Sequence, residues 1–250
     1  MIDLQLSGKV AIITGASRGL GYEMALALAE QEVKVLAVAR SIDDLRELES
    51  RNPDNIMVSQ CDMLDGAAVA ALPELAVQLF GAVDIVINNA GIAPATPFLE
   101  QDFDQWQRVF SVNVTAPAIL CRAAGEHMVA QASGKIINVA STSGILGKAN
   151  LAAYSSSKGA LLQFTKALAA EWAKFGVQVN AIAPGAFKTD AQSMVMESPE
   201  ILKRRVGKIP ARRMAESAEI GALTCYLASA QSDFVTGSVM VIDGGESSKL

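Results

Sequence analysis

Short apolar stretches alternate with longer segments of helical periodicity along most of the chain. The apolar stretches predict strands at 10–14, 33–39, 56–61, 84–88, 136–139, 177–182 and 239–242. Apolar residues at intervals of three or four predict helices from the first turn to about residue 32 and at 67–80, 103–131, 152–175 and 218–229. Strands that are apolar on both faces are typical of a parallel sheet between two helical layers. The order therefore predicts a single α/β domain over 1–250, a doubly wound Rossmann-type fold with a seven-stranded parallel sheet.

One long segment, residues 185–216, interrupts this alternation. It has no strand character, contains Pro199 and Pro210, and directly follows Pro184. Long insertions of this kind in a compact fold often serve as lids or binding loops. We therefore expect residues 185–216 to form a lid over the substrate.

A glycine-rich turn follows the first predicted strand and opens the first predicted helix. Residues 14–21 are T-G-A-S-R-G-L-G, with the glycine spacing G-x-x-x-G-x-G. Such glycines let the backbone turn tightly and approach a pyrophosphate at the positive end of a helix. The alternative is a tight turn that binds nothing. The turn predicts a dinucleotide site made by Gly15, Ser17, Arg18, Gly19, Leu20 and Gly21.

The end of the second predicted strand indicates which dinucleotide binds. NAD enzymes usually place Asp or Glu about 20 residues after the glycines, to hold the ribose 2′-hydroxyl. Here that place holds Ala39, and Arg40 follows it. Arginine suits a 2′-phosphate, and Arg18 can reach the same group. Residues 41–44, S-I-D-D, predict a capping box instead. The sequence thus favours NADP(H) over NAD(H).

Tyr154 and Lys158 lie four positions apart in a predicted helix, so both side chains share one face. A neighbouring ammonium favours the phenolate and lowers the pKa of tyrosine, which makes Tyr154 a candidate general acid/base. Ser141 follows the fifth predicted strand, where its hydroxyl can polarise a carbonyl. The Asn-Asn-Ala-Gly turn at 88–91 closes the fourth. Ligands of doubly wound sheets lie beyond such strand ends, so these groups are expected to meet.

Taken together, these motifs resemble the short-chain dehydrogenase/reductase family from about residue 6 to residue 245. The resemblance includes the turns at 14–21 and 88–91, residues 243–245 (D-G-G), and Asp62, Asn113, Ser141, Tyr154, Lys158, Pro184, Gly185 and Thr189. It implies a hydride transfer between a nicotinamide and a carbonyl or secondary alcohol. It also implies a homotetramer, formed through the long central helices and the C-terminal strand.

The resemblance further implies a role for each matching residue. Asp62 would hold the adenine edge, and Thr189 would meet the nicotinamide carboxamide. Lys158 would bind the ribose hydroxyls and depress the pKa of Tyr154, while Asn113 would hold a water that links Lys158 to solvent. Ser141 would orient the substrate oxygen. The implied cofactor site also contains Met63, Asn89, Ala90, Gly91, Tyr154, Pro184, Gly185 and Phe187.

The substrate is less clearly indicated. The stretches 134–138, 184–189 and 232–235 resemble the gluconate 5-dehydrogenase group, and the whole chain also resembles 3-oxoacyl-carrier-protein reductases. Lys148 is a candidate carboxylate ligand. We expect a sugar acid or polyol, with a 3-oxoacyl thioester as the alternative. The proposed lid offers apolar side chains (Phe187, Met194, Val195, Met196, Ile201) and basic ones that indicate a solvated face or attraction of an acidic partner (Lys203, Arg204, Arg205, Lys208, Arg212, Arg213).

Two other classes of protein, a hydrolase and a dinucleotide sensor, match parts of the sequence. Residues 15–19 also match the G-x-S-x-G elbow of hydrolases, but His127 is the only histidine and lies in a predicted helix. A dinucleotide sensor without chemistry would have lost the tyrosine or lysine, and both are present. The oxidoreductase is therefore favoured over both.

Composition narrows the partners. A net charge of −5 argues against nucleic-acid binding, because such proteins need a basic face. We expect no secretion signal, membrane span or zinc site, because the sequence shows no basic N-terminal region, no long uncharged apolar run and no metal-binding cysteine spacing. We expect a cytoplasmic protein with a small-molecule substrate. The terminal Ser248-Lys249-Leu250 matches a peroxisomal signal, which would apply if the source is a eukaryote.

Overall fold

A computed structural model describes residues 3–248, and it confirms the doubly wound α/β fold. Within these residues, seven strands form one parallel sheet in the order β3-β2-β1-β4-β5-β6-β9. The strands after β1 are added toward one edge of the sheet as far as β3, and from β4 on toward the other edge. This switch between β1 and β4 creates the crevice where such folds bind ligands. The strands are β1 (Val10–Thr14), β2 (Lys34–Ala39), β3 (Ile56–Gln60), β4 (Ile85–Asn88), β5 (Gly134–Val139), β6 (Val177–Pro184) and β9 (Val239–Ile242).

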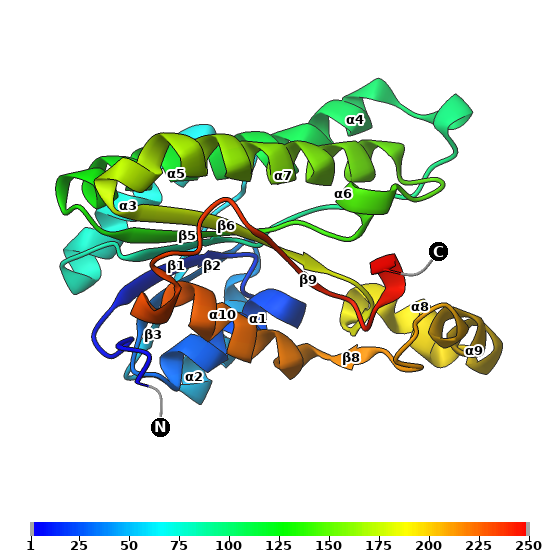
Figure 1. The fold of residues 1–250 in the computed structure, drawn as a ribbon, viewed down its shortest axis with the longest axis horizontal. Coiled ribbons are helices and arrows are strands. Elements are labelled where there is room, and N and C mark those ends of the chain that lie inside the picture. Colours follow the sequence, from blue (N-terminus) through cyan, green and yellow to red (C-terminus); the bar gives the residue numbers. More distant parts are fainter. Residues whose placement is uncertain (1–2, 249–250) are drawn as a thin grey trace.

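Helices cover both faces of the sheet (Figure 1). Every residue of β1, β4 and β5 is buried, because both faces of these strands pack against helices. One layer consists of α1 (Gly19–Ala29), α2 (Ile42–Arg51) and α10 (Ile220–Ala228). The other consists of α3 (Gly66–Phe80), α4 (Phe103–Phe110), α5 (Ala116–Ala130) and α7 (Ala152–Trp172).

Several short elements connect these helices and strands. They are η1 (Phe98–Glu100), α6 (Ser143–Leu146), η3 (Ala173–Phe175), η5 (Ser217–Glu219), η6 (Ala230–Ser232) and η7 (Glu246–Ser248). Ser41 is the N-cap of α2, but among the described residues its side chain makes no capping hydrogen bond. The predicted capping box is therefore wrong. The third helical residue is Asp44, one methylene shorter than the Glu or Gln that reaches back in a capping box.

The helix expected at 103–131 is helical from Phe103 to Ala130, but it contains a π turn. This turn, η2 (Ser111–Thr115), separates α4 from α5. It carries Asn113, whose fully buried amide bonds to the backbone of Ile92 on the neighbouring loop. Single π turns inside helices frequently occur at functional sites, and periodicity alone does not reveal them.

Residues 185–216, here called the 185–216 segment, contain more regular structure than expected. β7 (Phe187–Lys188) pairs with β8 (Ala215–Glu216), so the expected lack of strand character was wrong. Between them lie η4 (Asp190–Gln192), α8 (Ser193–Glu197) and α9 (Pro199–Gly207). Ala186, Ile209 and Met214 are buried in a small hydrophobic cluster of their own. The segment therefore has a core separate from that of the sheet.

The C-terminal turn packs against this segment. The carboxylate of Glu246 accepts two hydrogen bonds from the guanidinium of Arg205 on α9, one of them 2.7 Å long. Both side chains are mostly shielded from solvent. Asp243 orders the turn by accepting hydrogen bonds from the backbone N–H groups of Gly245 and Ser247. Of the expected Ser248-Lys249-Leu250 signal, the last two residues lie outside the described part of the chain.

Two features of membrane proteins and metalloproteins are absent from residues 3–248. No helix among them is long and apolar enough to cross a membrane. The same residues contain no group of three or more His, Cys, Asp and Glu side chains that could hold a metal ion.

Candidate active site

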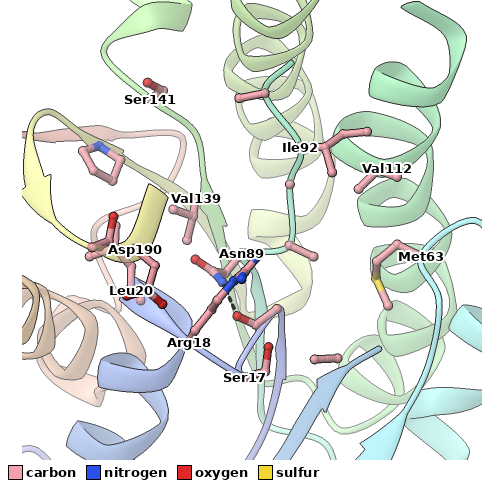
Figure 2. Close-up of a pocket in the computed structure, with 18 of the residues that line it drawn as sticks. Ser17, Arg18, Leu20, Met63, Asn89, Ile92, Val112, Val139, Ser141 and Asp190 are labelled. Atoms are coloured by element: carbon pink, nitrogen blue, oxygen red, sulfur yellow. Dashed lines mark hydrogen bonds between the residues drawn. The ribbon is translucent and has the colours of Figure 1, made fainter. Parts of the chain in front are cut away.

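A cleft of about 720 Å³ lies at the carboxyl ends of the strands. The turns that follow β1, β2, β3, β4, β5 and β6 all contribute residues to it, as the fold predicts. Figure 2 shows the turn with Ser17, Arg18 and Leu20 next to Asn89, and Ser141 at the far end of the cleft. Sequence motifs as far apart along the chain as Gly15 and Thr189 therefore meet in one place.

The glycine-rich turn forms a floor that leaves the start of α1 open. Gly15 has φ +67°, and a Cβ there would lie 2.8 Å from the Cα of Ala90. A Cβ on Gly21 would lie 2.3 Å from the carbonyl oxygen of Gly15, so only glycine allows this packing. No side chain of the described residues caps the N-terminus of α1. Its free N–H groups and positive end fit a phosphate ligand.

Hydrogen bonds join the glycine-rich turn to the Asn-Asn-Ala-Gly turn. The Asn89 amide Nδ2 donates to the carbonyl oxygens of Thr14 and Gly15, each at 3.0 Å. The Thr14 hydroxyl accepts from the backbone N–H groups of Asn89 and Ala90, each at 3.1 Å. These bonds hold the two turns at a fixed separation. The geometry explains the paired asparagines: Asn88 faces the core, and Asn89 holds the cleft floor.

Arg18 and Arg40 both line the cleft beyond the end of β2, with Ser41 and Asp44. Both arginines are exposed, and neither forms an ion pair with another described residue. This end of the cleft therefore presents two available guanidinium groups to an anion. Asp44 adds a carboxylate to the same end, which the sequence analysis had assigned only to helix capping.

Tyr154 and Lys158 lie side by side on α7. The Lys158 Nζ is 5.8 Å from the centre of the Tyr154 ring. Lys158 is 3% exposed, and its Nζ donates a 2.7 Å hydrogen bond to the backbone carbonyl of Val139 at the end of β5. The Ser141 hydroxyl lies close enough to the Tyr154 phenol to lower its pKa by hydrogen bonding. The structure thus brings the predicted Ser141, Tyr154 and Lys158 together at one end of the cleft.

Burial controls the protonation of this group. It lowers the pKa of Lys158 to about 8, and it raises the pKa of Tyr154, against the smaller opposite effect of the Ser141 hydrogen bond. We expected Lys158 to depress the pKa of Tyr154, and in the cofactor-free protein the net shift has the opposite sign. The Lys158 ammonium is directed to the Val139 carbonyl, and desolvation of the phenol outweighs the other effects.

Asn113 lies behind the cleft and does not line it. Its amide Nδ2 donates to the carbonyl of Ile92 and to the Ser157 hydroxyl, each at 3.0 Å, and its Oδ1 accepts from the N–H of Ile92. Gly91 fits between Asn113 and Lys158, because a Cβ there would lie 3.3 Å from Asn113 Oδ1 and 3.4 Å from Lys158 Nζ. Asn113 therefore anchors the loop that passes under Lys158.

Most of the predicted site residues line the cleft. The exceptions are Asn113 and Gly21, which support it from behind. Lys148 is exposed and does not line it. Sequence reasoning missed several lining residues: Ala39, Ser41, Asp44, Leu64, Ile92, Ala93, Arg108, Val112, Val139, Ala140, Asp190 and Gln192. The sequence assigns Ser41 and Asp44 only to helix capping, and most of the others belong to no motif. Arg108 and Val112 lie four positions apart in a predicted helix, which places them on one face of it.

The side chains expected as the apolar wall are placed differently. Phe187 lines the cleft, but Val195 packs in the cluster of the 185–216 segment, and Ile201 is exposed. Met196 does not line the cleft either, and the Met194 side chain lies outside the described part of the molecule. The cleft is instead lined on this side by polar Thr189, Asp190 and Gln192.

Three arginines of the basic run have partners within the described chain. Arg205 binds Glu246, and Arg213 makes two hydrogen bonds to the carboxylate of Glu219. Arg212 donates to the carbonyl of Gly207. Lys203 and Arg204 are exposed. Three of the six cations therefore bind groups of the chain itself, which supports a structural role for this part of the run.

A doubly wound parallel sheet with these groups at its carboxyl edge defines an oxidoreductase of the Rossmann type. A family model described as enoyl-(acyl carrier protein) reductase matches residues 15–247. The chain is 37% identical to a 2-dehydro-3-deoxy-D-gluconate 5-dehydrogenase of Pseudoalteromonas atlantica, over 96% of each chain. It is 33% identical to a 3-oxoacyl-[acyl-carrier-protein] reductase of Vibrio cholerae, over 97% of this chain and 98% of the other.

A solved structure agrees with these relatives. A gluconate 5-dehydrogenase from Burkholderia cenocepacia J2315, in complex with NADP and tartrate, superposes with a TM-score of 0.93. It is 32% identical, and the match covers 99% of this chain and 98% of that chain. The chain belongs to the short-chain dehydrogenase/reductase family, which confirms the resemblance of its motifs.

Proposed function

We propose that the protein is an NADP(H)-dependent oxidoreductase that interconverts a carbonyl and a secondary alcohol on a polyhydroxylated substrate. One observation carries the proposal. The proton-transfer group Tyr154, with Ser141 and Lys158, lies in the same cleft as an uncapped helix N-terminus and two available arginines. A hydride carrier and a proton donor can therefore meet a substrate in this cleft.

The glycine floor and the open start of α1 suit the pyrophosphate of the cofactor. Arg18 and Arg40 suit a 2′-phosphate, and Asp62 with Met63 suits the adenine side. The similar gluconate 5-dehydrogenase structure contains NADP. On the nicotinamide side we assign Asn89, Ala90, Gly91, Pro184, Gly185, Phe187 and Thr189, which all line the cleft.

When bound, the nicotinamide would supply or accept the hydride, and residues of the chain donate or accept the proton. In reduction, Tyr154 donates its phenolic proton to the carbonyl oxygen, which Ser141 orients by a hydrogen bond. Lys158 binds the cofactor ribose and keeps a positive charge near the phenolate that remains. In oxidation, the same phenolate accepts the alcohol proton. Asn113 acts through the loop beneath Lys158, and we assign it a supporting role.

For the substrate we favour a sugar acid or polyol. Asp190 and Gln192 offer hydrogen-bond acceptors and donors for several hydroxyl groups. The similar proteins of Pseudoalteromonas and Burkholderia are named for sugar-acid substrates. The alternative substrate is a 3-oxoacyl thioester on an acidic carrier protein. Such a carrier would bind to the basic side chains of the run near the cleft. The internal pairing of Arg205 and Arg213 makes this run less available to a carrier.

We also propose that the 185–216 segment is a lid. Its own apolar cluster lets it move as a unit, and its first residues already line the cleft. Lids of this kind exclude water during transfer. We place the enzyme in the cytoplasm, since Cys61, Cys121 and Cys225 are buried free thiols, as a reducing compartment favours.

The oligomer proposed is a homotetramer. β9 pairs with β6 only, so its other edge is unpaired within the described chain, and Val241 on this strand is 44% exposed. Pocket-forming side chains of α7 and β9 lie next to each other on this face, among them Leu162, Lys166 and Val239. An unpaired apolar sheet edge beside a helix is suited to a second copy of the chain.

A substrate panel tests the function. Gluconate, galactitol, their keto products and a 3-oxoacyl thioester are assayed with NADP(H) and NAD(H) by cofactor absorbance. We expect turnover of a polyhydroxylated compound, with preference for NADP(H). The Tyr154→Phe variant is the control: it should still bind cofactor but lose roughly 100-fold or more in rate. Absence of cofactor binding by wild type would contradict the proposal, and thioester turnover alone would favour the carrier alternative.

A further inference from the structure

A chain of buried hydrogen bonds runs beneath the candidate active site, outside the cleft. The Asn88 Nδ2 on β4 donates to Asn138 Oδ1 on β5 at 2.8 Å. The Asn138 Nδ2 donates to the Thr165 hydroxyl on α7 at 2.9 Å, and this hydroxyl donates to the carbonyl of Leu161 at 2.8 Å. Asn138 and Thr165 are fully buried, and Asn88 is 2% exposed.

The direction of this chain is fixed. Asn138 uses its oxygen for Asn88 and its amino group for Thr165, so a rotated amide would place donor against donor. The Thr165 hydroxyl accepts one bond and donates another. Asn88 also reaches Cys121 Sγ on α5. Fully satisfied buried networks rigidify the elements that they join, here two strands and two helices.

This hydrogen-bond network lies directly beside the hydrogen bond that joins Lys158 to β5. Asn138 precedes Val139, whose carbonyl accepts the hydrogen bond from Lys158 Nζ. Lys158 and Thr165 are seven positions apart, so they lie two turns, or about 10.5 Å, apart on one face of α7. α7 is thus attached to consecutive residues of β5 at two points: Thr165 to Asn138, and Lys158 to Val139.

We propose that Asn138 and Thr165 are positioning residues, which fix the register of α7 against β5 and thereby place Lys158 and Tyr154 for proton transfer. The effect that we expect on kcat rests on the proposed oxidoreductase function. Ser141 follows β5, two residues after its last residue Val139. The network therefore also sets the distance between Ser141 and Tyr154. A shift of α7 along β5 moves Tyr154 away from its hydrogen-bond partner.

The test compares three variants. Thr165→Val keeps the shape but removes the hydroxyl, and Thr165→Ser keeps the hydroxyl. Thr224→Val is the matched control, because Thr224 is also fully buried and donates to the carbonyl four residues earlier, but in α10 on the other face of the sheet. If Thr165→Val does not fold, Thr165→Cys replaces it, since a thiol is a weaker hydrogen-bond partner.

We expect Thr165→Val to lower kcat about tenfold or more with little change in cofactor Kd, because misplacing a reacting group by about 1 Å can cost on the order of 100-fold. Thr165→Ser should restore most of the rate. Thr224→Val should lower the melting temperature but leave kcat unchanged. Equal kcat losses in the Thr165→Val and Thr224→Val variants would overturn the proposal, as would normal kcat in a folded Thr165→Val enzyme.

A second measurement needs no substrate. The ionisation of Tyr154 in the NADP-bound protein is followed by near-ultraviolet absorbance, as the difference between each protein and its Tyr154→Phe derivative. We expect the Tyr154 titration to shift in Thr165→Val and to stay unchanged in Thr224→Val. An unchanged titration in both would overturn the positioning role. If wild type turns over no substrate but this shift is observed, the proposed function fails and the positioning role stands.

Discussion

At the scale of the residue, the burial of Tyr154 affects which protonation state of its phenol is present near neutral pH. The phenol is desolvated, so its pKa lies above the ordinary value and the proton is retained. A protonated phenol is ready to donate to a carbonyl, which is the requirement for reduction. Oxidation needs the phenolate. At pH values below the pKa, the phenolate fraction increases about tenfold for each unit by which the pH rises.

The first prediction follows from that sign. Oxidation of the alcohol should accelerate as pH rises from neutrality, while reduction of the carbonyl should be fastest at neutral or lower pH. Initial rates in both directions, measured across pH at saturating cofactor, check this. A pH-independent oxidation rate would show that Tyr154 does not supply the base. The residual rate of Tyr154→Phe should show no such rise.

The second prediction concerns Arg40. Arg40→Ala should lower kcat/KM for NADPH about tenfold, because a charge-assisted hydrogen bond to the 2′-phosphate is lost. The value for NADH should hardly change, since NADH lacks that phosphate. Steady-state kinetics with both cofactors provide the measurement, and Arg46→Ala on the exposed face of α2 is a matched control. Equal losses for the two cofactors would contradict the NADP assignment.

The sequence predicted the chemical residues better than their electrostatics. Ser141, Tyr154 and Lys158 were found because turns and helical spacing bring them together, and the structure confirms that they meet. The raised pKa of Tyr154 was not foreseen, because burial depends on packing between distant segments. Asp190 and Gln192 were also missed, since neither belongs to a periodic pattern or motif.

At the scale of the element, α9 of the 185–216 segment contacts the C-terminal turn. Arg205 and Glu246 form a two-point, largely shielded pair, whereas an exposed ion pair contributes little to stability. The pair connects the 185–216 segment to residues that follow β9. The segment is thus held at a point far from its two ends in the chain.

The third prediction tests this contact. Glu246→Gln should increase amide hydrogen exchange in residues 199–210 and raise the substrate KM, because the lid is held less firmly over the cleft. Asp43→Asn, which removes an exposed ion pair with Arg46, should change neither. Unchanged exchange in Glu246→Gln would show that the apolar cluster alone holds the segment.

Strands and long helices were predictable because their apolar periodicity is strong, and their observed limits differ from the expected ones by at most two or three residues. The short β7 and β8 were not, because two-residue strands contain no period. The π turn at Asn113 was missed for a different reason. The turn carries Asn113, whose side chain contacts the loop at Ile92, and a pattern along one segment does not contain such a contact.

At the scale of the whole molecule, the edge of the sheet at β9 supports the proposed assembly. The fourth prediction is that the protein elutes as a tetramer and that Val241→Lys yields smaller species, because a charge on a paired edge opposes association. Light scattering after size exclusion gives the mass. Met57→Lys, on the opposite edge strand β3, is the control, since Met57 is similarly exposed. A monomeric wild type would contradict the tetramer.

The two ends of the described chain leave the molecule at different places (Figure 1). Asp3 lies near Gln231, whose side-chain amide donates to its carbonyl, beside the end of α10. Glu246 lies against α9 of the proposed lid. A bulky group such as an affinity tag, attached on the C-terminal side of Glu246, therefore follows a residue that contacts α9, and it can alter measured kinetics through the proposed lid. An N-terminal tag begins away from it, so preparations for enzymology are best tagged there.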